Sequence, residues 1–154
     1  MTETFRPTIT GVVLMVPEAR ALTPWAHITI LAPFGKEGGP TASEIAGVEE
    51  FFADEMPFDY HLTKVCTFPS GLHYLSPEPA SAFSRLTHAL HHLFPDYSPY
   101  EGAFDLLVPH LTIPEEAATV PLPIHARARE AALLHHEDGE FTELARFPLG
   151  TSAA

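Results

Sequence analysis

Prolines limit the length of every regular element in this chain. Sixteen of the 154 residues are proline and nine are glycine, and they separate short runs of apolar residues. Proline lacks the backbone N–H that a helix interior or a central strand needs, so a run of regular structure is expected to end near the next proline. The chain is therefore expected to fold into short strands and short helices, with no solenoid repeat.

Hydrophobic patterning predicts more strands than helices. One helix is expected after the capping-box pair Thr41 and Glu44 and before Pro57, and a second from 80 to 94. Strands are expected over 10–16, 27–32, 58–68, 71–75, 103–108, 110–113, 129–135 and 141–149. The Asp138-Gly139 pair favours a tight hairpin between the last two strands. Because strands and helices do not alternate regularly, we expect an α+β domain with mainly antiparallel sheet.

The composition indicates one ordinary soluble domain over residues 1–154. Apolar residues make up 45% of the chain, and eight Lys and Arg against twenty Asp and Glu give a formal net charge of −12. Binding to duplex nucleic acid or to an anionic membrane rests on basic residues, so neither partner is expected. No run approaches the roughly 20 apolar residues of a membrane span, and the first residues lack a signal-peptide pattern. A monomeric cytoplasmic protein is expected.

Metal-ligand patterns are weak in this sequence. Cys66 is the only cysteine, which excludes an intrachain disulfide and a multi-cysteine metal site. His88 and His92 are one helical turn apart, but they lie opposite the apolar stripe of the predicted helix, which favours a solvated face. The adjacent pairs at 91–92 and 135–136 lack a third ligand at suitable spacing. We expect no metal and no cofactor.

One four-residue motif occurs twice. The segments 27–30 (HITI) and 110–113 (HLTI) are near copies, and both lie in apolar, proline-flanked strand segments. The bare pattern His-x-Thr arises easily by chance in a chain with ten histidines, and a third copy at 61–63 is followed by Lys64. Two copies that share Ile in the fourth place are improbable by chance. The doubled motif is therefore the strongest functional signal.

Strand geometry explains why the spacing matters. Side chains two residues apart point to the same face of a strand, so His27 and Thr29 project together, as do His110 and Thr112. Imidazole can give or take a proton near neutral pH, and a hydroxyl can donate to a phosphate oxygen. If the two strands face each other, this set suits phosphodiester chemistry without a metal.

The motifs and their surroundings resemble a known family. Residues 24–34 (PWAHITILAPF) and 109–113 (PHLTI) are similar to the two signature motifs of the two-histidine (2H) phosphoesterase superfamily, and the 2′-5′ RNA ligase and cyclic phosphodiesterase family is the branch they resemble most. The region 58–79 and the closing FPLG at 147–150 also resemble that family. The resemblance therefore extends from about residue 10 to residue 150.

The resemblance implies both an architecture and an activity. It implies two pseudo-symmetric lobes of mainly antiparallel sheet, with helices on the outside and a central groove. His27 and His110 would form the general acid/base pair, and Thr29 and Thr112 would bind phosphate. The implied partner is a nucleotide or short RNA end with a 2′,3′-cyclic or 2′-5′ phosphodiester, and the implied product keeps its phosphate on the 2′ oxygen. The sequence leaves open which histidine is the base.

Several residues have a second interpretation. Trp25, Phe34 and Tyr74 could stack on a base, or they could pack in the core or in the groove wall. Arg127 and Arg129 share one side of a predicted strand and could meet phosphate, although surface placement is the commoner outcome. The small number of basic residues favours a small or terminal cyclic phosphate over long RNA.

The third His-x-Thr copy and two non-catalytic functions are the alternatives to catalysis by the doubled motif. The His61–Thr63 copy is expected on the wetter face of its strand, opposite Tyr60 and Leu62, which makes it a decoy. The whole scaffold could also be a non-catalytic nucleotide- or phosphate-binding module. A protein-interaction domain would need a large exposed apolar patch, and the sequence shows no unexplained apolar stripe.

Overall fold

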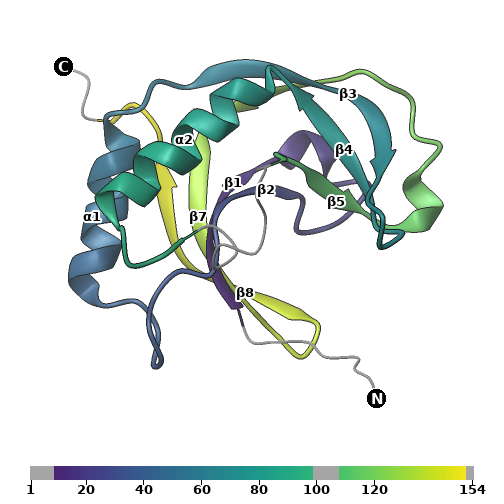
Figure 1. Cartoon of the computed structure of the whole chain (residues 1–154). Coiled ribbons are helices and arrows are strands. Elements are labelled where there is room, and N and C mark those ends of the chain that lie inside the picture. Colours follow the sequence, from purple (N-terminus) through teal and green to yellow (C-terminus); the bar gives the residue numbers. More distant parts are fainter. Residues whose placement is uncertain (1–8, 99–107, 152–154) are drawn as a thin grey trace.

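Two four-stranded antiparallel sheets form the body of the protein, as the computed structural model shows for residues 9–98 and 108–151 (Figure 1). The first sheet has the order β2-β1-β7-β8, from His27–Leu31, Ile9–Met15, Glu130–Glu137 and Glu140–Pro148. The second sheet has the order β5-β4-β3-β6, from Leu111–Ile113, His73–Glu78, Phe58–Thr67 and Ile124–Ala128. The predicted α+β fold with two lobes is confirmed.

Two helices cover one side of this body. Helix α1 (Ala42–Ala53) packs against β8, and helix α2 (Ala80–Leu93) packs against β2, and both lie on the same side of the molecule in Figure 1. Short 3₁₀ turns follow β1 (η1, Pro17–Ala19) and β5 (η3, Glu115–Ala117). Among the described residues, neither helix is long and apolar enough to cross a membrane.

Local signals account for several element boundaries. The Glu44 N–H donates to Thr41 Oγ1 at 3.0 Å, and the Thr41 N–H donates to Glu44 Oε1 at 2.9 Å. This capping box satisfies backbone donors at the start of α1, as predicted. At the β7–β8 hairpin, Asp138 has a φ of 54° and Gly139 a φ of 80°. Two consecutive positive φ values are typical of the tight turn that Asp-Gly favours.

Strand alternation gives the first sheet two distinct faces. The face toward the helices carries Val12, Leu14, Ile28 and Ile30, which join one continuous core cluster with the buried residues of the second sheet. The opposite face carries a smaller buried cluster, made up of Val13, Met15, Ala132 and Leu134, with Trp25 and Phe141 packed against it. Strand side chains alternate between faces, so His27 and Thr29 share this second face.

Sequence patterning missed one strand. Strand β6 (Ile124–Ala128) pairs with β3 in the second sheet, and its Ile-His-Ala-Arg-Ala sequence lacks the apolar content of a typical strand. The predicted strand at 71–75 begins instead at His73, because Gly71 adopts a φ of 95° in the turn before it. The strand predicted at 103–108 falls, except for Val108, outside the described residues.

Candidate functional site

The two copies of the repeated motif lie on edge strands that face each other. His27 is the first residue of β2, at one edge of the first sheet, and His110 directly precedes β5, at one edge of the second sheet. Cα atoms of β2 and β5 approach within 8 Å of one another. Segments 83 residues apart in sequence therefore meet, and we call the surface formed by His27, Thr29, His110 and Thr112 the histidine face.

Both imidazoles are anchored through the same nitrogen. His27 Nδ1 lies 2.6 Å from the carbonyl oxygen of Trp25, and His110 Nδ1 lies 2.7 Å from the carbonyl oxygen of Val108. A carbonyl oxygen only accepts hydrogen bonds, so each Nδ1 must carry the hydrogen and donate it. The neutral form of each ring therefore has its lone pair on Nε2, which is the nitrogen available for proton transfer.

The surroundings favour the neutral form of both rings. Burial lowers the pKa of His27, against an opposing effect of the Trp25 carbonyl, and the positive charges that His110 and His136 can carry lower it further. Burial likewise lowers the pKa of His110, against the opposing effect of the Val108 carbonyl. Desolvation penalises a charged imidazole. The contacts between β2 and β5 bring the two motifs together, so a positive charge on His110 lowers the pKa of His27.

The two threonines of the motifs lie beside their histidines with free hydroxyls. Ile28 and Leu111, which follow the histidines, are fully buried, so Thr29 and Thr112 project from the opposite face of each strand. Thr29 is half-buried and Thr112 is exposed. Within residues 9–98 and 108–151, neither hydroxyl has a hydrogen-bond partner in the protein. Both are thus available to donate to a ligand.

Aromatic rings flank each imidazole. Phe68 lies 5.0 Å from the His110 ring, nearly perpendicular to it, and Tyr74 lies 5.7 Å away. On the other lobe, Phe141 lies 5.5 Å from the His27 ring at an angle of 71°, and it also packs against Trp25. Of the three predicted stacking residues, Trp25 and Tyr74 therefore lie near the histidine face. Phe68 and Phe141 were missed, because no local pattern marks them.

Phe34 does not share this surface. Its side chain is 1% exposed, and its ring packs against Phe94 and Tyr97 at centroid distances of 5.1 and 5.0 Å. A ring with so little exposed surface cannot stack on a base. The stacking interpretation of Phe34 is therefore wrong, and the core interpretation holds, because Phe34 belongs to the continuous core between the helices and the sheets.

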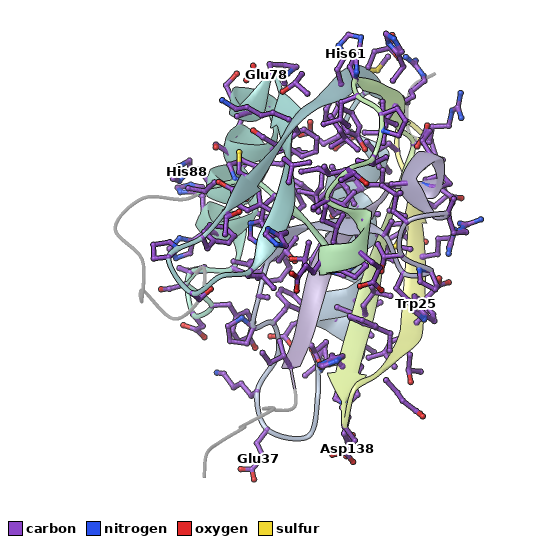
Figure 2. The ribbon with its side chains drawn as sticks, turned by 90° about the vertical axis from the view of Figure 1, so that its right-hand side faces the viewer. Trp25, Glu37, His61, Glu78, His88 and Asp138 are labelled. Carbon is purple, nitrogen blue, oxygen red and sulfur yellow. The ribbon has the colours of Figure 1, made fainter. Side chains whose placement is uncertain are left out.

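The other histidines separate into one neighbour and several remote residues. His136 packs against Phe141 at 4.6 Å and so approaches His27 from β7. His61 is exposed and its ring faces His125 at 4.4 Å, as expected for a strand residue outside the core. Figure 2 shows His61 and His88 well away from Trp25. The part of the chain that the structure describes contains no group of three His, Cys, Asp or Glu side chains that could hold a metal ion.

Comparisons with known proteins identify a family model and similar folds. Residues 12–145 match a family model described as the 2′-5′ RNA ligase superfamily. The fold is similar to the crystal structure of TT0787 from Thermus thermophilus, with a TM-score of 0.67, 20% identity, and coverage of 92% of this chain and 97% of that one. It is also similar to Escherichia coli LigT complexed with NADP+, with a TM-score of 0.59, 16% identity, and coverage of 94% and 99%. A comparison with curated proteins finds no match.

Proposed function

Because the chain belongs to the 2′-5′ RNA ligase superfamily, we propose that it is a metal-independent phosphodiesterase that uses His27 and His110 as a general acid/base pair. The substrate class is a nucleotide or a short RNA end with a 2′,3′-cyclic phosphate or a 2′-5′ linkage. Solved structures of the similar E. coli LigT hold NADP+, 3′-AMP and ATP, which supports a nucleotide as the ligand. The expected compartment is the cytoplasm, and the expected state is a monomer.

The proposed chemistry uses the two free Nε2 atoms. One histidine, in its neutral form, takes a proton from water while the water oxygen bonds to phosphorus. In a 2′,3′-cyclic phosphate the bond from phosphorus to the 3′ oxygen breaks, and in a 2′-5′ linkage the bond to the 5′ oxygen breaks. In each case the other histidine, in its protonated form, gives its proton to the departing oxygen. The product keeps its phosphate on the 2′ oxygen. General acid/base catalysis of this kind contributes roughly 10²–10⁴-fold to a rate.

The threonines have a binding role in the proposal. Their unpartnered hydroxyls, at Thr29 and Thr112, donate to the nonbridging phosphate oxygens and hold the phosphorus between the two imidazoles. The rings of Trp25 and Tyr74 provide stacking surfaces for a base, since stacking tolerates any base. The observation that carries the proposal is the convergence of two His-x-Thr pairs from opposite lobes, with both imidazoles anchored through Nδ1.

A turnover screen tests this proposal. The wild-type protein is assayed in the presence of EDTA on 2′,3′-cyclic nucleotides, 3′,5′-cyclic nucleotides and 2′-5′ linked dinucleotides. We expect EDTA-resistant turnover of the first or third class and none of the second. Absence of turnover on all of them, combined with tight binding of a cyclic nucleotide that survives the His27→Ala/His110→Ala double substitution, would establish a non-catalytic binding module instead.

A further inference from the structure

Half of the chain's basic residues line one cavity. Arg20, Arg127, Arg129 and Arg146 surround a cavity of about 360 Å³ whose other walls are Met15, Pro17, Glu130 and Pro148. The whole chain has only eight Lys and Arg and a formal net charge of −12. A volume above about 300 Å³ is in the range of small-ligand sites. We call this cavity the arginine pocket.

Strand register places the arginine pocket on the same side of the first sheet as the histidine face. Thr29 lies opposite Val13, Val13 opposite Ala132, and Ala132 opposite Arg146, so these residues form one row across β2, β1, β7 and β8. Residues opposite each other in antiparallel strands point to the same face. Arg146 therefore projects from the face that carries Thr29.

The near wall of the pocket adjoins the first histidine. Met15 lines the pocket, and it lies directly opposite His27 in the β1–β2 pair. The far wall is on β8, which carries Arg146 and lies three strands from β2. With strands about 4.8 Å apart, the backbone of Arg146 is about 14 Å from that of Thr29. Because its near wall adjoins His27, the pocket lies within reach of the phosphate next to the reacting phosphorus.

Carboxylates hold two of the four guanidinium groups in place. Arg127 pairs with Asp59 at 2.8 Å and donates its backbone N–H to Glu18, and Arg146 pairs with Glu130 at 2.6 Å and also with Glu143. A guanidinium has five N–H donors, so each of these arginines retains donors after its carboxylate contacts.

The other two arginines lack a direct carboxylate contact within the described residues. Among the described residues, neither Arg20 nor Arg129 forms an ion pair with a carboxylate. Both side chains are exposed and both line the cavity. Arginine guanidinium groups match the oxygens of a phosphate in a two-pronged geometry. The pocket therefore offers two free guanidinium groups and two that carboxylates orient.

We propose that the arginine pocket binds a second phosphate group of the substrate, one that is not cleaved. This inference rests on the proposed function for the identity of the first phosphate. The second phosphate has two possible sources with the same chemistry: the backbone linkage of an oligonucleotide end, or a terminal phosphate of a small nucleotide. A nucleoside cyclic phosphate that lacks a further phosphate leaves the pocket empty.

The test compares three substrates in the Arg20→Gln/Arg129→Gln double variant. The substrates are a nucleoside 2′,3′-cyclic phosphate, the same compound with a 5′-phosphate, and a dinucleotide that ends in a 2′,3′-cyclic phosphate. Arg85→Gln, which removes an exposed arginine on α2 that is paired with Glu55, is the matched control. We expect KM to rise about ten- to hundredfold, the worth of a lost hydrogen bond to a charged group, for one or both substrates with a second phosphate.

The KM of the nucleoside cyclic phosphate should not change, and the substrate that responds identifies the source of the second phosphate. Equal KM values in wild type and double variant for all three substrates would overturn the proposal. A binding experiment separates it from the proposed function: calorimetric titration with an ordinary 3′-5′ dinucleotide needs no turnover. Weaker binding by the double variant, and not by Arg85→Gln, supports the pocket even if no substrate is cleaved, whereas equal binding contradicts it.

Discussion

His27 and His110 hydrogen-bond to their own backbone in the same way: in each, Nδ1 donates to the carbonyl oxygen two residues earlier, at 2.6 Å in one and 2.7 Å in the other. The two lobes thus present equivalent imidazoles, each with a free Nε2 and each flanked by a phenylalanine ring. Equivalent orientation suits a reaction in which one ring accepts a proton and the other donates one.

The pH dependence of kcat/KM follows from the burial of the two rings. Burial penalises the charged form, so the pKa of both His27 and His110 lies below 6.5 in the free protein. Activity needs one neutral and one protonated ring, so kcat/KM should follow a bell-shaped curve with its maximum below pH 6.5. The two limbs report the coupled pair of histidines. A profile that is flat or rising up to about pH 8 would contradict this reasoning.

His136 is predicted to tune His27 without taking part in the proton transfer. A positive charge on His136 lowers the pKa of His27, so His136→Gln should move the kcat/KM profile of the coupled pair to higher pH. The shift should shrink at high salt, which screens charges. His61→Gln is the matched control, since His61 is exposed and paired with His125 instead. An identical profile for both variants counts against the electrostatic link.

The threonine hydroxyls are predicted to act in binding. Thr29→Val and Thr112→Val keep the branched shape but remove the donor, so each should weaken binding of the phosphate by about tenfold or more. Thr→Ser at the same positions keeps the hydroxyl and should retain most of the affinity. Steady-state kinetics on the best substrate from the screen gives the comparison. If the valine variants keep the wild-type kcat/KM, the two hydroxyls do not bind the phosphate.

Phe34 and Tyr74 should respond to substitution in opposite ways. Phe34→Ala removes a ring that is 1% exposed and should cost roughly 3–5 kcal/mol of unfolding free energy. Tyr74→Ala removes a half-buried ring beside His110, so it should weaken substrate binding more than it lowers stability. Urea denaturation and KM measured on both variants provide the check. A Phe34→Ala protein with wild-type stability and a KM above that of wild type would show that Phe34 contacts the substrate.

Features set by local chemistry could be predicted from the sequence. Three features each depend on a few consecutive residues: the capping box at Thr41, the Asp138-Gly139 turn, and the strand alternation that buries Ile28 and turns Thr29 to the other face. Strand β6 escaped prediction because its Ala and His residues carry little β signal, and it forms through pairing with β3.

Features set by register between distant strands could not be predicted in this way. Phe141 reaches His27 only because the β7–β8 hairpin extends the first sheet beside β1. The arginine pocket likewise assembles side chains from β1, β6, β7, β8 and the segments beside them. The sequence marked Arg127 and Arg129 as possible phosphate contacts, but Arg20 and Arg146 join them only through the fold. Composition reports the sum of the charges, whereas binding depends on where they lie.

The most direct measurement of the central claim is turnover of a dinucleotide ending in a 2′,3′-cyclic phosphate by His27→Ala, His110→Ala and the double variant, with the product identified by phosphorus NMR. If both imidazoles act on one phosphorus, each single variant should lose roughly 10²–10⁴ of the rate. The double variant should then lose little more than the worse single variant, because residues that act as a unit are not additive. The wild-type product should carry its phosphate on the 2′ oxygen. Wild-type turnover by either single variant would contradict the account.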